Sequence, residues 1–288
     1  MNSESNTTIQ FTKMHGAGND YVFIDGRNST LNWSSLAVSI SDRHFGVGSD
    51  GLIVALESED ADIRMQMYNL DGSEGKMCGN GIRCFVSFGV NIGLLERDSA
   101  SYSVETASGT LEVTPIWQND QMVAASVNMG QPGFLSSEVP FVLEGYDAVE
   151  DHDLEIDGQH FAVSALSMGN PHAVTILDTP ISGFDLAQIG PKIENHPMFP
   201  EQVNFEIINI LNRDSIALRV WERGSGQTLA CGTGACAAAV IAIKKGLVNN
   251  KVTVKLPGGD LEIHWENNSD VYMKGPIATV FQGRYHLN

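Results

Sequence analysis

ACGTGACAAAVIAI (Ala230–Ile243) is the stretch that decides the fold of this chain. A cysteine between small residues precedes an apolar run that is shorter than the roughly 18 residues needed to span a bilayer. A second stretch, MCGNGIRCFVSFGV at positions 77–90, has the same form. A helix that is apolar on nearly every face must be buried all round. Each stretch therefore predicts a buried helix that begins directly after a cysteine.

The two stretches indicate an internal duplication. Residues 78–81 (CGNG) recur as residues 231–234 (CGTG), at an offset of 153. Further matches at nearly the same offset join 65–68 with 218–221, 108–113 with 258–263, and 18–19 with 169–170. Four matches in constant order are hard to obtain by chance. The chain is therefore expected to repeat a unit of roughly 130 to 150 residues.

Short alternating runs in both halves predict a fold dominated by strands. They are FTKM, YVFID, GLIVAL, IRMQMY, YSVET and LEVTPIW in the first half, and FAVSAL, AVTIL, VNFEIINIL, IALRVW, VTVKL and LEIHW in the second. A further helix is expected at 34–44, and Gly93 and Gly246 stand where the two central helices should end. The expected class is α+β, with two pseudo-symmetric domains, each a curved, mostly antiparallel sheet or barrel around a central helix.

Domain limits follow from the repeat. The first domain is expected at 1–133, joined by a returning C-terminal strand at 277–288, and the second at 134–276. Related halves pack about a pseudo-twofold axis, and sites form readily at such interfaces. The active site is therefore expected in a cleft between the two domains.

The charge and the composition of the chain exclude some classes of binding partner. The 17 basic residues against 35 acidic ones give a net charge of −18. Nucleic acid and membrane surfaces are therefore not expected partners. Residues 1–11 have no basic or apolar signal region, so a cytoplasmic protein is expected. Structural disulfides are rare in such a reducing compartment, and the spacing of the four cysteines fits a zinc site poorly.

The thiols at the helix starts suggest acid–base chemistry. Unpaired N–H groups and the helix dipole form an anion site and lower the pKa of a nearby thiol. A tight strand-to-helix turn is the alternative explanation, but recurrence of the cysteine in both copies favours function. Cys78 and Cys231 on opposite sides of one ligand could remove a proton from one face of a carbon and return one to the other. No cofactor and no metal is expected, and Cys84 and Cys236 are expected to be inert and buried.

Seven motifs resemble the diaminopimelate epimerases over essentially the whole chain. They are FTKMHGAGNDYVFID (11–25), DRHFGVGSDGL (42–52), YNLDGSEGKMCGNGIRC (68–84), MGNPHAV (168–174), VNF (203–205), WERGSGQTLACGTGACA (221–237) and LPGGDLEI (256–263). The resemblance implies two similar domains and a cofactor-independent interconversion of LL- and meso-2,6-diaminopimelate. It also implies a role in the supply of lysine and peptidoglycan precursors.

The resemblance implies a role for each matching residue. The catalytic thiols are Cys78 and Cys231, with Cys78 taking the proton of the LL isomer. The remaining site residues are Gly79, Asn80, Gly232 and Thr233 for the reacting carboxylate, Asn19, Asn69, Asn170, Asn204 and Arg223 for the distal amino-acid head, Glu222 as a substrate contact, and His172 and Glu222 as modulators of the thiol pKa. His15 is expected to be structural.

Two positions depart from relatives. Gly51 stands where some members have Gln, so only backbone could contribute there. Phe281 stands where relatives have a Tyr that supports dimer formation, so a homodimer with Phe281 as a contact is expected.

Four other functions are compatible with parts of the sequence. A proline or hydroxyproline racemase-like enzyme would not need the asparagines and Arg223 that recognise a second amino-acid head. An isomerase of the phenazine pathway usually lacks the paired cysteines. A thiol redox or metal-binding protein, which stoichiometric zinc would indicate, and a non-catalytic amino-acid binding module are alternatives from other classes.

Overall fold

The computed structural model describes residues 8–287, so most of the N-terminal stretch judged above for a secretion signal lies outside the described residues. The chain divides into two compact units. Unit 1 comprises the chain up to Val127 together with the segment from Gly275 onward, and unit 2 comprises Asn128–Lys274. No helix among the described residues is long and apolar enough to cross a membrane.

The boundaries differ from those expected at 133/134 and 276/277. The segment after Val127 is tied to unit 2, because the Asn128 side chain donates to Asp270 at 2.8 Å and the Met129 amide donates to the Val271 carbonyl. Gly133 then bridges to Ser167. These contacts place residues 128–133 in unit 2, and the sequence pattern does not reveal them.

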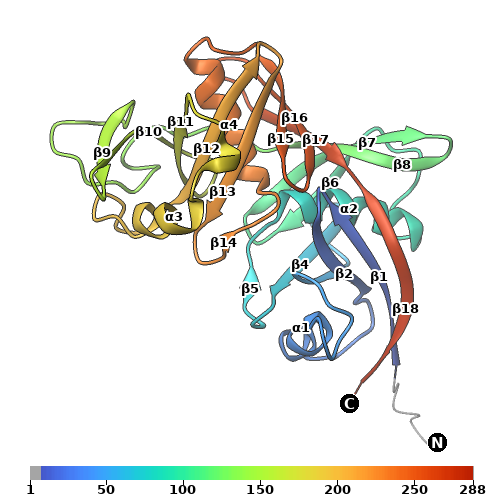
Figure 1. Cartoon of the computed structure of the whole chain (residues 1–288). Helices are drawn as coiled ribbons and strands as arrows, with labels where there is room; N and C mark the ends of the chain where they lie inside the picture. The colour runs from blue at the N-terminus through green and yellow to red at the C-terminus, as the bar shows by residue number, and fades with distance from the viewer. Residues whose placement is uncertain (1–7, 288) are drawn as a thin grey trace, which may run out of the picture. The chain divides into compact units, whose positions relative to one another are not determined.

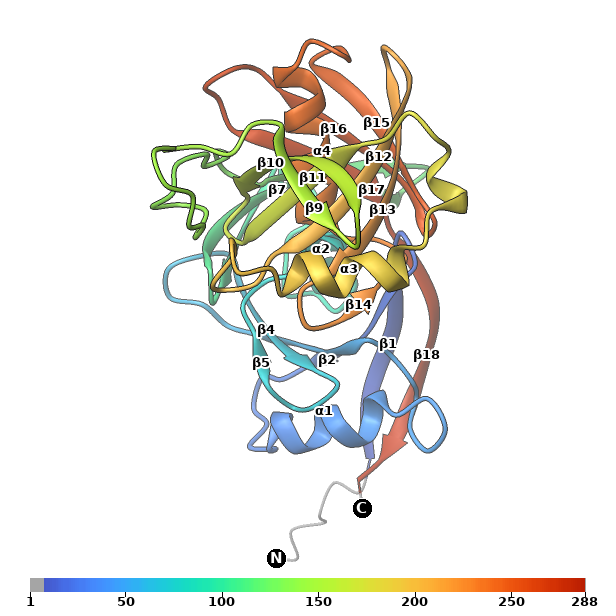
Figure 2. The same ribbon diagram turned by 60° about the vertical axis from the view of Figure 1, so that its left-hand side comes forward.

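Unit 1 surrounds one long helix with strands (Figure 1). Its elements are β1 (Thr8–Gly16), β2 (Asn19–Asp25), α1 (Trp33–Ser41), β3 (Gly51–Leu56), β4 (Ile63–Asn69), β5 (Glu74–Gly75), α2 (Gly79–Asn91), β6 (Tyr102–Thr106), β7 (Gly109–Gln118), β8 (Gln121–Asn128) and β18 (Ala278–His286). Strand β18 pairs antiparallel with β1 from Thr8↔His286 to His15↔Ala278, so the C-terminal tail returns to the first unit as expected. The two strands run side by side in Figures 1 and 2.

Unit 2 also consists of strands around one long helix. Its elements are β9 (His152–Ile156), β10 (Gln159–Ser167), β11 (Pro171–Ile176), a 3₁₀ helix (Ile181–Gly183), α3 (Leu186–Glu194), β12 (Asn204–Asn212), β13 (Ser215–Glu222), β14 (Gly226–Gln227), α4 (Gly232–Lys244), β15 (Lys251–Leu256), β16 (Gly259–Trp265) and β17 (Val271–Pro276).

The strand pairings are the same in the two units, as a duplication requires. Strands β2 and β3 are parallel and β3 and β4 antiparallel, and β11, β12 and β13 repeat this pattern. A short helix connects the parallel pair in each unit, α1 in the first and α3 in the second. Helix α3 was not predicted, because Pro191 lies inside it and interrupts the apolar pattern. The α+β class with mostly antiparallel sheets is confirmed.

The central helices fill the two cores because they lack a polar face. In α4 every residue from Gly234 to Ile243 is buried, and in α2 every residue from Gly79 to Gly89 is buried. Each helix ends just before a glycine in the left-handed region, Gly93 at φ 73° and Gly246 at φ 68°. At the other end, the side chain of a cysteine caps each helix. The fold thus fixes each thiol at the start of a buried helix.

Candidate active site

Cys78 is the N-cap residue of α2. The Gly81 amide donates to its sulfur at 3.4 Å, and the thiol donates to Asn19 Oδ1 at 3.1 Å. The side chain is partly exposed, and the first turn of the helix carries no acidic residue. The amide dipoles at this helix start favour negative charge, so they stabilise a thiolate or a bound carboxylate.

A carboxylate orients Asn19. Asp50 Oδ2 accepts from Asn19 Nδ2 at 2.7 Å and from the Asp20 amide at 3.1 Å, while Arg43 donates to Asp50 Oδ1 at 2.8 Å. Because Nδ2 faces Asp50, Oδ1 is the atom left to accept from Cys78. Sequence reasoning missed Asp50, although it lies in the quoted motif DRHFGVGSDGL.

A buried phenol also contacts the Cys78 thiol. Tyr21 lies on β2, and its hydroxyl hydrogen bonds with the side chains of Cys78 and Asn19. Burial raises the pKa of Tyr21 well above its usual value, and negative charge on Cys78 raises it further. The phenol therefore stays protonated in this unit. It was another residue that the sequence analysis did not select.

Arg83 stabilises the first turn of α2 by hydrogen bonds. Its guanidinium is fully buried and donates to the Gly79 carbonyl at 2.9 Å and to Asn80 Oδ1 at 2.8 Å. A Cβ on Gly16 would stand 2.9 Å from Arg83 Nη2, so this packing needs glycine there. A single charge inside an otherwise apolar helix was the sequence signal for Arg83. The residues expected to hold the reacting carboxylate, Gly79 and Asn80, are thus held rigidly.

Asn69, a predicted site residue, and Gly51, which departs from relatives, lie on the neighbouring strands β4 and β3. Asn69, at the end of β4, is exposed, and its side chain donates to Ser73 at 3.0 Å. Its contact with substrate stays a prediction. Gly51 pairs with Asn69 across β3 and β4, and a Cβ there would stand 2.3 Å from the Tyr68 carbonyl oxygen. Gly51 is therefore required by strand packing in this chain.

Cys231 caps α4 in unit 2. The Gly234 amide donates to its sulfur at 3.3 Å, and the Thr233 hydroxyl lies 3.5 Å from it. The thiol is buried. Burial raises the pKa of Cys231 well above its usual value, and the carboxylates of Glu222 and Glu206 raise it further. This cysteine is therefore held as a thiol.

Glu222 provides an acceptor for that thiol. The Cys231 side chain hydrogen bonds with the Glu222 carboxyl group, which also accepts from the Thr228 hydroxyl. Burial raises the pKa of Glu222, and these two hydrogen bonds oppose the rise. Glu222, which is predicted to modulate the pKa of a thiol, thus contacts Cys231 within unit 2. Thr228 was not predicted.

His172 is enclosed by two acceptors. The ring is fully buried, with Nδ1 2.7 Å from Glu206 Oε1 and Nε2 3.0 Å from Asn170 Oδ1. Glu206 is also fully buried, and its Oε2 has no hydrogen-bond partner among the described residues. The acid in the apolar run VNFEIINIL was the missed signal for Glu206. Asn170 and His172 are thus in contact with each other, and the Glu206 carboxylate contacts the other nitrogen of the His172 ring.

Asn204 and Arg223 meet at the backbone. Asn204 Nδ2 donates to the Pro171 carbonyl at 2.8 Å, and its Oδ1 accepts from the Arg223 amide at 2.9 Å. The Arg223 side chain is exposed, with Nη1 donating to the Glu201 carbonyl at 3.0 Å. Asn204 therefore fixes the turn that displays Arg223.

Glu194 holds the other side of the same turn. Its carboxylate accepts from Trp221 Nε1 and from the Gly224 amide, each at 2.7 Å. A Cβ on Gly190 would stand 2.5 Å from the Trp221 ring, so the indole packs directly on α3. Glu222 and Arg223 lie between the two anchored residues. The unexpected helix α3 is thus what positions them.

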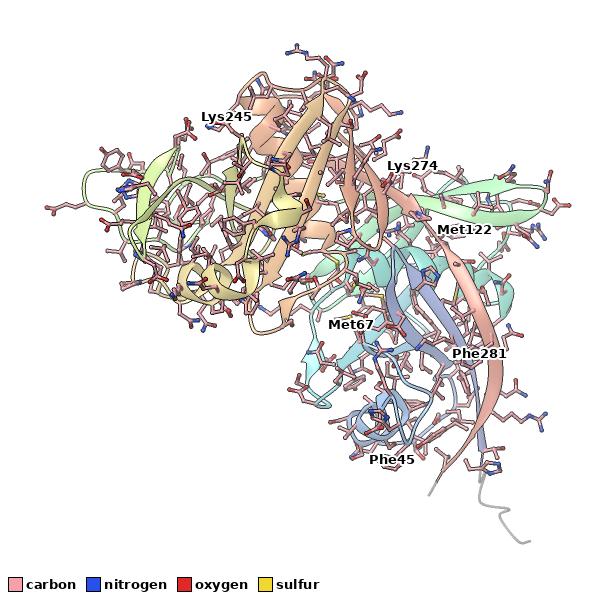
Figure 3. All side chains as sticks on the ribbon, viewed as in Figure 1. Phe45, Met67, Met122, Lys245, Lys274 and Phe281 are labelled. Carbon is pink, nitrogen blue, oxygen red and sulfur yellow. The ribbon has the colours of Figure 1, made fainter. Side chains whose placement is uncertain are left out.

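Three further predicted positions can be placed. Cys84 and Cys236 are free and buried, and burial raises the pKa of Cys84 to about 12, which makes it unreactive. Phe281 is labelled on β18 in Figure 3, with 46% of its surface exposed and its ring edge-on to Phe11 at 5.8 Å. A dimer contact at Phe281 stays a prediction.

The fold is shared with racemases and epimerases. A hydroxyproline epimerase from Agrobacterium vitis matches with a TM-score of 0.72 at 14% identity, over 98% of this chain and 92% of that one. A phenazine biosynthesis protein from Bacillus anthracis matches with a TM-score of 0.68 at 16% identity, over 97% and 99%. At such identities the likeness establishes the fold alone.

Sequence relatives define the class as an isomerase, specifically an epimerase. Diaminopimelate epimerases from Acetivibrio thermocellus and Methanococcus maripaludis are 45% and 42% identical over 97% of this chain and 99% and 100% of theirs. The family model for diaminopimelate epimerase matches residues 11–135 and 164–280. The chain belongs to the diaminopimelate epimerase family.

Proposed function

We propose that this chain interconverts LL- and meso-2,6-diaminopimelate without a cofactor, with Cys78 and Cys231 as the two acid–base groups. The observation that carries the proposal is the repeated thiol: each unit caps its buried central helix with a cysteine and surrounds the sulfur with hydrogen-bond partners. The relatives named diaminopimelate epimerase, at 42–46% identity over nearly their whole length, support the substrate.

The reaction needs one proton removed and one supplied. In the LL-to-meso direction, Cys78 acts as thiolate and takes the α-proton, leaving the electron pair on the α-carbon and its carboxylate. Cys231 then donates its S–H proton to the opposite face. The meso-to-LL direction exchanges the roles. The raised pKa of Cys231 supports its role as the donor in the first direction, because it keeps the proton on sulfur.

Backbone amides would stabilise the carbanion. The small residues that follow each cysteine let a substrate carboxylate approach the backbone N–H groups at the starts of α2 and α4. Negative charge that develops on the reacting carboxylate is stabilised by donors already fixed in place. Asn69 and Arg223 have exposed side chains and are proposed to bind the distal amino-acid head, together with Asn19, Asn170 and Asn204.

Solvent isotope exchange tests the proposal. Incubation of reduced enzyme with LL-diaminopimelate in deuterated water should give the meso isomer with deuterium at one α-carbon. Cys78→Ser and Cys231→Ser should each lower kcat by at least about a hundredfold, since a hydroxyl is a far weaker acid–base group at neutral pH. Cys236→Ala, a buried thiol elsewhere in α4, is the matched control and should retain activity. Wild-type turnover in both serine variants would rule out the two-thiol mechanism.

The substrate is tested separately. Proline and trans-4-hydroxyproline should show no α-proton exchange, because neither carries a second amino-acid head for Arg223 to bind. Exchange with either, and none with diaminopimelate, would favour the racemase-like alternative. The proposed biological role, in the cytoplasm, is the supply of lysine and peptidoglycan precursors.

A homodimer formed through β18 is part of the proposal. Phe281 and Val280 are adjacent exposed apolar residues, at 46% and 53% exposure, on a strand of nine residues. Phe281→Asp should convert a dimer to a monomer in analytical ultracentrifugation. Tyr272→Asp, which alters a similarly exposed aromatic residue in unit 2, should leave the dimer intact. A monomeric wild-type protein would contradict this part of the proposal.

A further inference from the structure

Glu206 and Ile53 occupy equivalent places in the two units. Glu206 lies on β12, and Ile53 lies on β3, at the same offset of 153 that relates the two cysteines. A Cβ on Gly234 would stand 2.7 Å from Glu206 Oε1, and a Cβ on Gly81 would stand 2.7 Å from Ile53 Cδ1. The position that packs against the first turn of the central helix is therefore apolar in unit 1 and carries a carboxylate in unit 2.

The ring that follows the equivalent asparagine differs between the two units as well. His172 follows Asn170 by two residues just as Tyr21 follows Asn19. Tyr21 is a phenol that keeps its proton, because burial raises its pKa. Histidine, by contrast, ordinarily changes charge between about pH 5 and 8. A histidine at this place needs a partner if its protonation is to stay constant.

The contacts of His172 determine how many protons the ring carries. Both ring nitrogens face acceptor oxygens, Glu206 Oε1 at 2.7 Å and Asn170 Oδ1 at 3.0 Å. When Glu206 is ionised, both hydrogen bonds form only if each ring nitrogen carries a proton, which makes the ring an imidazolium; if Glu206 held the proton instead, it would donate to Nδ1 and the ring would be neutral. The 2.7 Å separation is typical of a charge-assisted bond between a cation and a carboxylate.

Glu206 has no other described role. Its Oε2 has no partner among the described residues, so its one described hydrogen bond is to His172. Burial raises the pKa of Glu206, and the charge of His172 opposes that rise. A buried carboxylate left without this cation would be costly, so the two residues depend on each other.

We propose that Glu206 is a positioning residue that keeps His172 doubly protonated, so that His172 acts as a fixed cation near Cys231 and not as a base. The groups facing this pair are Glu222 from β13 and the Cys231 thiol at the start of α4. The fixed cation offsets the Glu222 carboxylate and the thiolate that forms when Cys231 gives up its proton. This role in turnover rests on the proposed function, but the protonation state does not.

Nitrogen NMR of the histidine rings tests the protonation state directly. In protein labelled with ¹⁵N-histidine at about pH 7, the His172 ring, assigned by its loss in His172→Gln, should show two protonated nitrogens. Glu206→Gln, which keeps the shape but removes the charge, should convert one of them to an unprotonated nitrogen. A singly protonated His172 in the wild-type protein at about pH 7 would overturn the proposal, whether or not any variant folds.

Enzyme kinetics then distinguish the effect of the Glu206 charge from a structural effect of the substitution. In Glu206→Gln, kcat/KM should fall by roughly ten- to hundredfold at about pH 8 and recover toward acid pH, where the ring regains its second proton. Glu206→Asp, which keeps the charge, should restore part of the loss. Asp153→Asn removes an exposed carboxylate that contacts His160 at 2.9 Å and is the matched control, with an unchanged pH profile. An equal loss at all pH values would overturn the charge role. Isotope exchange with diaminopimelate tests the proposed function independently.

Discussion

Asp50 Oδ2 lies 2.7 Å from Asn19 Nδ2, and this contact decides which way the Asn19 amide points. Its oxygen is thereby directed to the Cys78 thiol, 3.1 Å away. Asn19 is consequently a fixed acceptor for the thiol, although its neutral amide could otherwise turn over. A carboxylate that does not contact the sulfur thus controls the geometry at the sulfur.

Asp50→Asn should lower kcat/KM by roughly ten- to hundredfold, the effect of a lost hydrogen bond to a charged group. The substituted amide could still accept from Asn19, but it would no longer bind Arg43 as an ion pair, so the Asn19 amide would lose its single orientation. Steady-state kinetics measures the loss, and thermal unfolding should show a much smaller change. The control is Asp62→Asn, which removes the charge of an exposed carboxylate bound to Ser103. Equal kinetics in the two variants would contradict the orienting role.

Glu194→Gln should weaken both stability and catalysis. The carboxylate holds Trp221 and Gly224 on either side of Glu222 and Arg223. A glutamine can accept only one of these bonds well, so about 1–3 kcal/mol of the free energy of unfolding should be lost. KM should rise because Arg223 is displaced. Denaturant unfolding and kinetics measure the two effects. Glu201→Gln, an exposed acid that contributes only its backbone carbonyl to Arg223, should change neither.

Gly234→Ala should damage unit 2 at the thiol. The new Cβ would stand 2.7 Å from Glu206 Oε1 and 3.3 Å from the Cys231 sulfur, so one of them must move. Such overpacking typically costs about 1–3 kcal/mol in stability, and we expect kcat to fall with it. Gly183→Ala introduces a Cβ with no atom within 4 Å and is the control. A fully active Gly234→Ala variant would show that the turn tolerates the shift.

The fold was predicted correctly from the sequence in those segments where the apolar residues recur with a regular period. The strands of the two halves and the helices after Cys78 and Cys231 are all present, because alternation and uniform apolarity directly specify burial. Helix α3 was missed because Pro191 masks its pattern. The limit between the two compact units differs from the expected one, and it depends on contacts such as Asn128 with Asp270, which lie far apart in the sequence.

The candidate site was predictable only for residues in recognisable motifs. The asparagines and the two thiols came from motif positions, and the structure joins Asn19 to Cys78 and Asn170 to His172. The supporting residues were not predicted, namely Tyr21, Asp50, Arg83, Glu194 and Glu206. Each of them acts by a side-chain contact that no local spacing reveals. A lone charge in an apolar run was the available signal for Arg83 and Glu206.

Three of the four thiols, Cys78, Cys231 and Cys84, should react with iodoacetamide in a fixed order. Cys78, partly exposed, should be alkylated first at about pH 8, and Cys231 more slowly, because burial and two carboxylates raise its pKa. Cys84 should not react until the protein unfolds, because its pKa is raised from 9.0 to about 12. Peptide mass spectrometry against time measures each site. Alkylation of Cys231 ahead of Cys78 would contradict the difference in burial and charge between the two thiols.

The same raised pKa of Cys84 predicts an alkaline limit to stability. The unfolded thiol ionises near pH 9.0 and the folded one near 12, so the stabilisation is full below pH 9.0 and declines as the pH rises through that window. The melting temperature should therefore fall between about pH 9 and 12, and Cys84→Ala should reduce that fall, although it starts from a lower value because of the lost packing. Cys236→Ala gives the matched loss of a buried sulfur. An identical pH slope in wild type and Cys84→Ala would mean that ionisation of Cys84 does not drive alkaline unfolding.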